Sequence, residues 1–495
     1  MSALAAAFLG LFAVQPLRDT VLSAATALPC TPATADDSAW TASFKNYWQG
    51  GNDRALEAIT ESLRQLNELA AATTPAEESE MHANAVTPVR LRSYARLFAF
   101  AFLSKRAFVS VDEFVRGLEL TEGMFQPTPQ PSVVFRFHFD KIMYDTAHAA
   151  SVLQSLMPRE ASAGAGDDSA VRRLVSCDYT RVDERTALDE ATASELTVEG
   201  MNMPLDVHVA PDVPDTLERA LERSFLTLGD PPGMSCLLTL PDTLAFQIHR
   251  YVPAPHDSGV YAERHPFQCP ERLSLGKFMY KNRRQAALGY QRLRKLREEH
   301  AALVAKRVEL SSHEGTAALE LFDDSITIVE AGAAAALDPD ERDSQSQLAK
   351  SLRGMRDTTA AAIDECDREL QANVATQDSL FDGLADEGAY DLRALLFHNG
   401  LNGRSSAWAV VRSDEPNGGW WRVSDLDVNP TKLEDALRER SGLYMDCGLY
   451  AALYQRADYK ADTESAIPAE YYLALTEDNE AFERELAQAR EDDDW

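Results

Sequence analysis

Apolar residues recur at helical spacing through roughly the first third of the chain. The clearest runs lie within Leu56–Leu66, Leu91–Phe98 and Phe137–Met157, where apolar side chains follow one another at steps of three or four residues. This period places them on one face of a helix. Pro158 and the small-residue segment ASAGAGDDSA that follows it predict a loop. We therefore expect residues 1–160 to be helical.

The pattern changes to short strand-like runs between about residues 170 and 275. Proline, glycine and aspartate clusters separate these runs, as expected of strands joined by turns. One amphipathic helix, DTLERALERSFLTL, interrupts them. The predicted strands lie in the segments RRLVSCDYTRV, SELTVEG, MPLDVHVA, MSCLLTL and TLAFQIHRYV.

Residues 276–388 return to a helical pattern. Two long, charged, glycine-poor stretches are separated by the small-residue and acidic segment EAGAAAALDPDERDSQ. Two helices joined by such a bend predict an antiparallel hairpin, with a coiled coil as one form of it. The apolar stripe is thin, so a solvated arm with a narrow packing seam is the simplest interpretation.

Strands return from residue 389, in YDLRALLFHNG, SAWAVVRS, GWWRVSDLDV and GLYAALYQRA. The last thirty or so residues are polar and acidic and predict a helix followed by a tail. Because strands flank the helical segment on both sides, we expect the two strand regions to build one sheet system. The fold class is therefore α+β, with the helical arm as an insertion within a domain.

Composition and charge narrow the classes of function. Hydrophobic residues make up 45% and charged residues 26% of the 495 positions, which is enough apolar material for a globular core. The net charge of −31 argues against a nucleic-acid partner or an anionic membrane, since both require a basic face. No run of eighteen apolar residues occurs beyond the N-terminal region, so no membrane span is expected.

The cysteines and the N-terminus bear on the cellular compartment. The six cysteines are scattered without a C-x2-C pair, which favours reduced thiols in the cytosol or nucleus over a zinc site or a disulfide framework. The first fifteen residues, MSALAAAFLGLFAVQ, fit either a signal sequence or a buried helix. They lack a positive n-region and continue into the amphipathic PLRDTVLSA, so we favour the buried helix.

Several ordered motifs resemble the ubiquitin-specific protease family. LPDTLAFQIHRYV (Leu240–Val252) is similar to the family's leucine-proline pair followed by a strand with an arginine-aromatic step, and HPFQCPERLSLGKFM is similar to the strand that leads into the palm. The segments YDLRALLFHNG, SAWAVVR, WWRVSDLDV and LYAALYQR follow in the family's order. The insert narrows the likeness to a branch with a helical arm, which includes a ubiquitin-ligase-associated deubiquitinase of fungi.

The resemblance implies a papain-like cysteine protease fold with thumb, palm and fingers, and no cofactor or metal. It divides the chain as follows: helical thumb, 1–160; fingers and first palm half, 161–275; helical arm, 276–388; second palm half, 389–458; acidic C-terminal helix and tail, 459–495.

The residues at the family's catalytic positions do not fit thiol catalysis. The resemblance aligns the nucleophilic cysteine with Ser2, at the start of the first thumb helix, the histidine with Ser406, and the orienting Asn or Asp with Ser424, beside which Asp425 is retained. His398 matches a structural histidine of the family. A serine without a neighbouring histidine has no general base, so its hydroxyl would not attack an isopeptide at a useful rate.

The family's glutamine-glutamine-aspartate stretch, which helps to hold the ubiquitin tail, aligns near Val133, Val134 and Phe135. Trp408 and Trp421 are candidate ubiquitin-binding residues, with packing in the palm sheet as the favoured alternative. Cys447 is expected to be a buried structural thiol and not a substitute nucleophile.

Three functions remain open from the sequence. The first is a catalytically inactive deubiquitinase scaffold that binds ubiquitin, polyubiquitin or a ubiquitin ligase complex. The second is an active ubiquitinyl hydrolase whose assigned N-terminus is incorrect. The third is a protein that self-associates through its helical arm and does not bind ubiquitin.

Overall fold

The computed structural model describes fifteen stretches of the chain, and all structural statements concern these residues. They are 2–27, 91–106, 131–156, 173–188, 197–210, 215–227, 232–253, 260–262, 267–313, 316–384, 388–399, 407–415, 418–424, 427–438 and 448–493. The helical run at Leu56–Leu66, together with Ser406, Asp425 and Cys447, lies outside this part of the chain.

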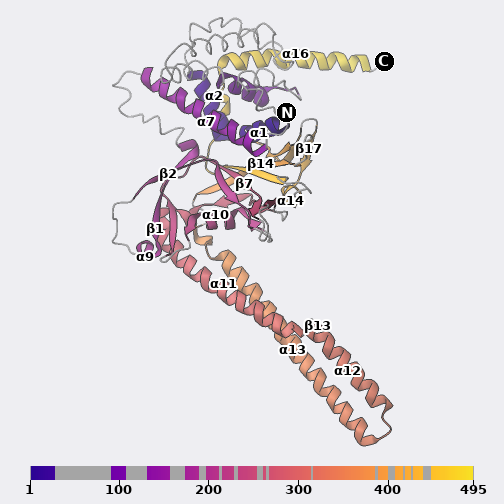
Figure 1. Ribbon diagram of the computed structural model, residues 1–495. Helices are drawn as coiled ribbons and strands as arrows, with labels where there is room; N and C mark the ends of the chain where they lie inside the picture. Colours follow the sequence, from indigo (N-terminus) through magenta and orange to yellow (C-terminus); the bar gives the residue numbers. More distant parts are fainter. Residues whose placement is uncertain are drawn as a thin grey trace. The chain divides into compact units, whose positions relative to one another are not determined.

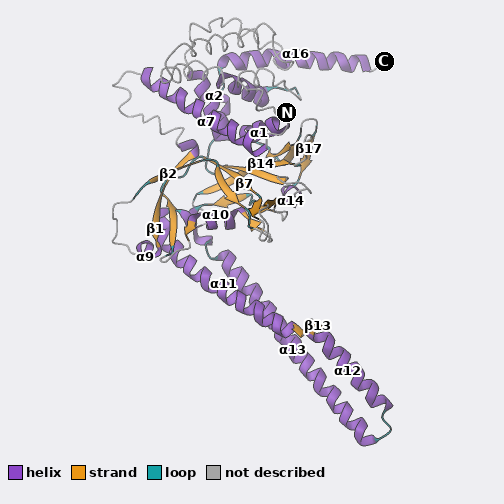
Figure 2. Cartoon of the chain, in the orientation of Figure 1, coloured by secondary structure: helices purple, strands orange, loops and turns teal. Residues whose placement is uncertain are grey.

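The chain divides into two compact units. The first comprises residues 1–181, 195–274 and 388–495, and the second comprises residues 182–194 and 275–387. Helix and sheet are mixed in the first unit, whereas the second is almost entirely helical (Figures 1 and 2). The α+β class expected from the sequence is therefore confirmed at this level.

Two short apolar helices begin the first unit, α1 (Ser2–Ala13) and α2 (Gln15–Ala27). They meet at a bend of 94°. Pro16 accounts for the break, because proline has no N–H to continue the hydrogen-bond ladder and its ring clashes with the preceding turn. Leu11, Val14 and Leu17 are at most 1% exposed, so the predicted burial of the first helix is confirmed. Its expected continuation into PLRDTVLSA is wrong, because the bend separates that segment as α2.

Further helices surround this pair. The α7 helix (Pro131–Leu156) packs against both α1 and α2, and residues 91–103 form another buried helix. The short α15 (Thr463–Ala466) contacts α2. The acidic α16 (Ala469–Asp493) is held to residues 103–106, where the Arg106 guanidinium binds both carboxylate oxygens of Asp478 at 2.9 and 3.0 Å.

An eight-stranded sheet forms the centre of the first unit. Its main order is β17-β16-β15-β14-β18-β7-β3, and β11 pairs with β14 outside this path. Strands β3, β7 and β11 of the first strand-forming region join the strands of the second region in it, whereas β1, β2, β5 and β6 form a separate sheet, so the expectation of one sheet system is confirmed only in part. Their bounds are β3 Leu205–His208, β7 Thr243–His249, β11 Arg272–Ser274, β14 Ala389–His398, β15 Ala407–Arg412, β16 Trp420–Val423, β17 Val428–Thr431 and β18 Gly448–Arg456.

Strands β14 and β18 are buried along almost their whole length. This burial explains why their sequences are nearly continuous apolar runs and do not alternate.

A smaller four-stranded sheet has the order β2-β1-β6-β5. It contains β1 (Ser176–Asp183), β2 (Glu199–Asn202), β5 (Leu226–Thr227) and β6 (Gly233–Leu237). The predicted amphipathic helix becomes α10 (Leu217–Phe225), whose first turn is capped by the Thr216 hydroxyl, which accepts a bond from the Arg219 N–H at 3.2 Å. The remaining elements of this unit are β4 Asp215–Thr216, β8 Tyr251–Pro253, β9 Val260–Ala262, β10 Phe267–Gln268 and α14 Leu433–Arg438.

The second unit is a helical arm. The long α13 (Pro339–Ser379) runs antiparallel to α11 (Arg283–Ser311) along one half of its length and to α12 (Ala318–Ala335) along the other (Figure 2). The less exposed positions of α13 recur at alternating steps of three and four residues from Gln345 to Gln377, as in a coiled coil. The other elements are α9 Glu184–Leu188, η4 Gly276–Phe278, η5 Tyr280–Asn282, β12 Ser312–His313, β13 Thr316–Ala317 and η6 Asp382–Leu384.

The two-helix hairpin expected from the sequence is wrong in one respect, because the described residues of the arm form three long helices. The segment interpreted as a bend, EAGAAAALDPDERDSQ, is mostly helical: its alanines complete α12, and the turn is confined to residues 336–338. Alanine is the strongest helix former, and the Asp338 side chain caps α13 by accepting a bond from the Asp340 N–H, with Pro339 at the first helical position.

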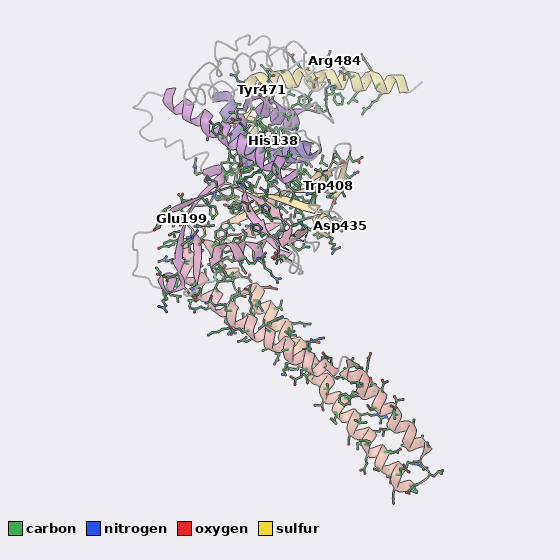
Figure 3. The ribbon with its side chains drawn as sticks, in the orientation of Figure 1. His138, Glu199, Trp408, Asp435, Tyr471 and Arg484 are labelled. Atoms are coloured by element: carbon green, nitrogen blue, oxygen red, sulfur yellow. The ribbon has the colours of Figure 1, made fainter. Side chains whose placement is uncertain are left out.

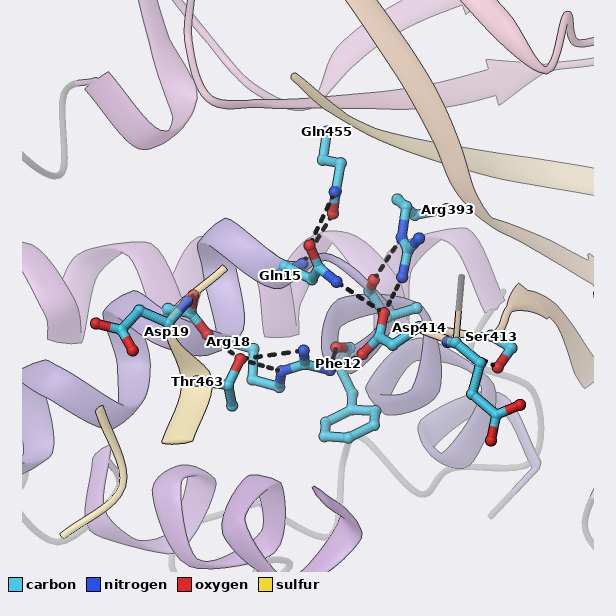
Figure 4. A network of polar contacts seen from close by, with 12 residues as sticks. Phe12, Gln15, Arg18, Asp19, Arg393, Ser413, Asp414, Gln455 and Thr463 are labelled. Atoms are coloured by element: carbon cyan, nitrogen blue, oxygen red, sulfur yellow. Dashed lines mark hydrogen bonds and ion pairs between the residues drawn. The ribbon is translucent and has the colours of Figure 1, made fainter. Parts of the chain in front are cut away.

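A buried polar network fixes the α1–α2 corner to the sheet (Figure 4). Arg18 is 1% exposed; its guanidinium donates to the Thr463 hydroxyl at 3.1 and 3.3 Å and pairs with Asp414 at 2.9 Å. Arg393 on β14 also pairs with Asp414 and donates to the Ala13 carbonyl at 3.1 Å. One carboxylate thus neutralises two buried arginines from different elements.

Replacing Asp414 tests this network. Removing one partner of a buried ion pair costs roughly 3–5 kcal/mol, because the other charge stays buried. Since Asp414 keeps 34% exposure, we expect Asp414→Asn to lower the free energy of unfolding by about 2 kcal/mol. All six tryptophans lie outside residues 275–387, so urea unfolding followed by tryptophan fluorescence reports on the first unit. Glu415→Gln, at the exposed neighbour, is the control; an equal loss in both variants would contradict the assignment.

Two glycines of the arm provide a second matched pair. A Cβ added at Gly289 would lie 2.5 Å from Cε1 of the Phe381 ring, whereas one added at Gly354 meets no atom within 4 Å. We expect Gly289→Ala to destabilise the arm by about 1–3 kcal/mol through overpacking. Gly354→Ala should stabilise it by up to about 1 kcal/mol, because alanine favours the helix. Amide hydrogen exchange of α11 and α13 in the full chain measures both effects; a stabilising Gly289→Ala would disprove the close contact.

Candidate functional site

The candidate site lies at one end of the eight-stranded sheet. Two contacts give the direction of α1 across β14: Arg393 reaches the carbonyl of Ala13, and a Cβ on Gly10 would lie 2.8 Å from Cδ2 of Leu396. The chain directions of α1 and β14 are therefore opposed: the C-terminal end of β14 lies on the side of the N-terminal end of α1. The start of α1, where the sequence has Ser2, points to the end of the sheet at which β14 finishes with His398.

Strands β15 and β16 reach the same end. His398 pairs with Ala407, the first residue of β15, and Ala409 pairs with Val423, the last residue of β16. Ser424 follows β16, and its backbone N–H donates to the Asp427 carbonyl at 2.9 Å. Of the predicted catalytic positions, Ser424 is therefore placed at this end, and Ser2 is placed only by the backbone of α1. Ser406 and Asp425 lie outside the described residues.

His398 lies within this end of the sheet and is only 3% exposed. Burial, together with the nearby positive charge of Arg250, lowers the pKa of His398 to about 4. The centroids of the His398 and Tyr450 rings lie 5.4 Å apart, with the rings in an edge-on arrangement. Tyr450 lies at a bulge of β18, two residues after Gly448, whose φ is 106°. A buried imidazole that stays neutral at pH 7 packs well, but it lacks the exposure and basicity of a general base.

Figure 3 labels Trp408 among the side chains of the sheet unit. It is buried, with 8% of its surface exposed. Its ring stacks on Phe397 with a centroid distance of 5.7 Å and an interplanar angle of 3°, and the Arg422 guanidinium lies 4.6 Å from the ring centroid. The indole Nε1–H is buried and has no hydrogen-bond partner among the described residues. Trp408 therefore has the environment of a packing residue that carries one unused donor.

Trp421 lies on the opposite face of the sheet. Val410 pairs with Arg422 and Val411 with Trp421, and alternate residues of a strand point to opposite faces. Arg422 contacts the Trp408 ring, so Trp408 shares the face of Arg422 and not that of Trp421. Trp421 is 39% exposed and available to a partner, whereas the neighbouring Trp420 is buried. The two candidate ubiquitin-binding tryptophans do not line one surface.

The segment aligned with the glutamine-glutamine-aspartate stretch forms part of the first half of α7. Val133 is 56% exposed, and Phe135 is fully buried against Phe139, with ring centroids 5.9 Å apart. The same helix carries His138, whose Nδ1 lies 3.0 Å from the Tyr94 hydroxyl; burial lowers its pKa to about 4. Sequence analysis missed His138, because one histidine among apolar residues gives no signal of its burial.

The described cysteines do not provide a nucleophile. Cys177, Cys236, Cys269 and Cys366 are buried free thiols. Burial raises the pKa of the Cys177 and Cys269 thiols to about 12, so both stay protonated and unreactive near neutral pH.

No group of three or more His, Cys, Asp or Glu side chains among the described residues could hold a metal ion. Within the same residues no single helix is long and apolar enough to cross a bilayer; α1 and α2 pass that test only as a pair, across their 94° bend.

Comparison with known proteins adds no family assignment. No protein-family model matches the chain, and no curated protein matches it.

The two buried histidines predict how stability depends on pH. In each, the folded pKa of about 4 lies below the ordinary value of 6.5, so the folded state resists protonation. The contribution of each neutral histidine to the free energy of unfolding is complete above pH 6.5 and is lost as the pH falls towards 4. A shift of this size corresponds to about 3 kcal/mol per histidine. We expect the stability difference between wild type and His398→Gln to shrink by about that amount from pH 7 to 4, in urea unfolding monitored by fluorescence.

The stability difference between wild type and His138→Gln should shrink over the same pH range, since burial also lowers the pKa of His138. Parallel wild-type and variant curves from pH 7 to 4 would show that the histidines are accessible to protons in the folded state.

Proposed function

We propose that this chain is a catalytically inactive scaffold of the ubiquitin-specific protease type, which acts by binding ubiquitin or polyubiquitin. In this proposal α1, α2 and α7 correspond to the thumb and the eight-stranded sheet to the palm. The four-stranded sheet corresponds to the fingers, and residues 275–387 are an inserted arm.

The observation that carries the proposal is the direction of α1 across the sheet. A papain-like thiol protease needs its nucleophile at a helix N-terminus, where the helix dipole lowers the thiol pKa, and its histidine on an adjacent strand. The start of α1 points to the end of the sheet where β14 and β16 finish and β15 begins. This arrangement supports the alignment of Ser2, Ser406 and Ser424 with the three catalytic positions.

The chemistry at these positions supports the loss of activity. A serine hydroxyl has a pKa far above 7 and needs a base, and removing the histidine of such a site typically costs several orders of magnitude in rate. The described histidine at this end, His398, is buried and neutral and is engaged with Tyr450. Binding functions do not need these groups, so loss of catalysis leaves the surface of the scaffold free to serve a partner.

The test combines reaction and binding. We expect no adduct between the full chain and ubiquitin carrying a C-terminal propargyl group, and no cleavage of lysine-linked ubiquitin chains. Titration of the chain into isotope-labelled ubiquitin, followed by amide NMR spectra, should show binding. Trp421→Ala should weaken this binding several-fold, because a half-exposed tryptophan is a typical interface anchor.

Tyr472→Ala is the matched control, because Tyr472 is an aromatic residue of α16 with 50% exposure, outside the sheet. It should leave ubiquitin binding unchanged. Adduct formation or chain cleavage would instead support the alternative of an active hydrolase.

The absence of any spectral change at millimolar protein would exclude ubiquitin binding and leave assembly through the arm as the alternative. One observation favours that alternative, since eight of the sixteen large exposed hydrophobic side chains among the described residues lie on the arm. They are Leu288, Val304, Val308, Ile328, Leu337, Leu348, Met355 and Val374.

A further inference from the structure

The distal half of the arm has one uncharged side. Here α12 and α13 pack along a seam whose positions recur at steps of three and four residues, from Leu319 to Ala336 and from Gln345 to Ile363. None of the twelve residues that immediately precede a seam position is charged, whereas seven of the twelve that immediately follow one are charged. Seven in twenty-four is close to the 26% of the whole chain, yet all seven lie on one side.

Ion pairs show which side carries the charges. Glu330 pairs with Arg353, and Asp323 pairs with Arg356, in both cases between α12 and α13. Asp323, Glu330 and Arg353 each follow a seam position. Because one residue turns a helix by about 100°, residues that precede and residues that follow a seam position lie on opposite sides of the seam. The uncharged residues of both helices therefore lie together, on the side away from these ion pairs.

Six residues form the centre of the uncharged side, three on each helix at a spacing of seven. We call these six residues the neutral face: Leu321, Ile328 and Ala335 on α12, and Leu348, Met355 and Ala362 on α13. Ile328 is 72%, Met355 57% and Leu348 50% exposed. A two-helix hairpin buries only its seam, so an apolar helix seated between the two rows would complete a three-helix bundle.

Acidic residues border the neutral face. The α13 row continues at the same spacing to Glu341 on one side and to Glu369 on the other, and Asp324 borders the α12 row. All three carboxylates are exposed, and none has a hydrogen-bond or ion-pair partner among the described residues. From Leu348 to Ala362 the helix rises about 21 Å. The surface is therefore apolar for about four helical turns and negative at both ends.

We propose that the neutral face binds an amphipathic helix of a partner protein, whose apolar side covers Ile328, Leu348 and Met355 and whose Lys or Arg residues meet the bordering acids. Burial of the apolar side chains provides affinity, and the opposite charges fix the position of the helix along the arm. A second copy of the chain fits less well, because it would bring the unpaired acids of both copies onto one interface. This role uses only the arm and does not rest on ubiquitin binding.

Fluorescence anisotropy with the full chain measures this binding at physiological salt. The probe is a fluorescein-labelled 18-residue peptide with leucines at steps of three and four residues and lysines at the other positions. The comparison peptide has the same composition in an order that gives no apolar side. Because the interface is small, we expect the first peptide to bind with a dissociation constant on the order of micromolar. The second should bind at least tenfold more weakly, since it presents no apolar face.

A pair of matched variants tests the apolar contact. I328Q/M355Q removes two side chains of the neutral face and should weaken binding of the first peptide at least tenfold, while glutamine keeps the helix. V304Q/V374Q removes two exposed apolar side chains elsewhere on the arm and should change binding less than twofold. Circular dichroism checks that helix content is equal in all variants.

A second pair tests the bordering acids. E341Q/E369Q removes the carboxylate at each end of the α13 row, and should weaken peptide binding several-fold and reduce its dependence on salt. E309Q/D378N changes the net charge of the arm equally at exposed positions outside the neutral face, and should change binding less than twofold.

Three outcomes would overturn the proposal. Equal binding of the two peptides, or equal effects of I328Q/M355Q and V304Q/V374Q, would show a non-specific attraction between opposite charges. A dimer of the full chain in sedimentation velocity, dissociated by I328Q/M355Q, would assign the neutral face to a second copy. No binding of the first peptide at millimolar protein would show that the neutral face is a solvated surface.

Discussion

The arrangement of the first unit depends on the burial of one arginine. Arg18 lies at the bend between α1 and α2, between the rings of Phe12 and Phe102 at 4.9 Å from each centroid, and is almost completely removed from water. A buried guanidinium is tolerated only when its donors are satisfied. The partners that satisfy it, Asp414 and Thr463, come from the turn after β15 and from α15, so the helix pair can pack in only one position.

The position of α1 has a direct consequence for the candidate site. Gln15 at the start of α2 receives bonds from, and donates to, Gln455 of β18, and its amide also donates to Asp414 at 3.0 Å. Together with Arg393 at Ala13, these contacts hold the C-terminal end of α1 and so direct its N-terminal end towards His398. A catalytic centre needs such rigid positioning of a helix start against strand ends. In the function proposed above, this positioning is kept, while serines stand at the positions that the resemblance aligns with the catalytic residues.

The arm is stabilised differently from the sheet unit. Its seam includes Cys366, Asn373 and Ala349, which are small or polar, and the Asn373 amide donates to the Leu296 carbonyl at 3.1 Å. Ion pairs such as Arg307 with Asp367 and Arg356 with Asp323 lie along the contact between its helices. Exposed pairs of this kind contribute little individually. The arm therefore relies on length and continuous helix packing, which leaves its surface free to vary in charge, as the contrast between its neutral face and the charged side opposite shows.

Local sequence determined most of the secondary structure, because helix and strand periods are properties of neighbouring residues. Strands β14, β15 and β18, helix α10 and the long α11 and α13 all follow from apolar spacing and turn residues. The third arm helix did not, because its alanines run directly into the Asp and Pro residues that form the turn, and the whole segment was interpreted as a bend. The serines at the aligned catalytic positions could also be read directly from the sequence.

Only the tertiary structure decided which side chains are buried and which share a surface. Arg18 and Asp414 are almost four hundred residues apart, and no local pattern predicts that they pair. Likewise, Trp408 and Trp421 belong to neighbouring strands, but their placement on opposite faces depends on the register of β15 against β16. A shift of one residue in register would exchange the faces, and register is set by contacts across the whole sheet. The sequence alone therefore identified the candidate residues, whereas the fold determined which of them is exposed to a partner.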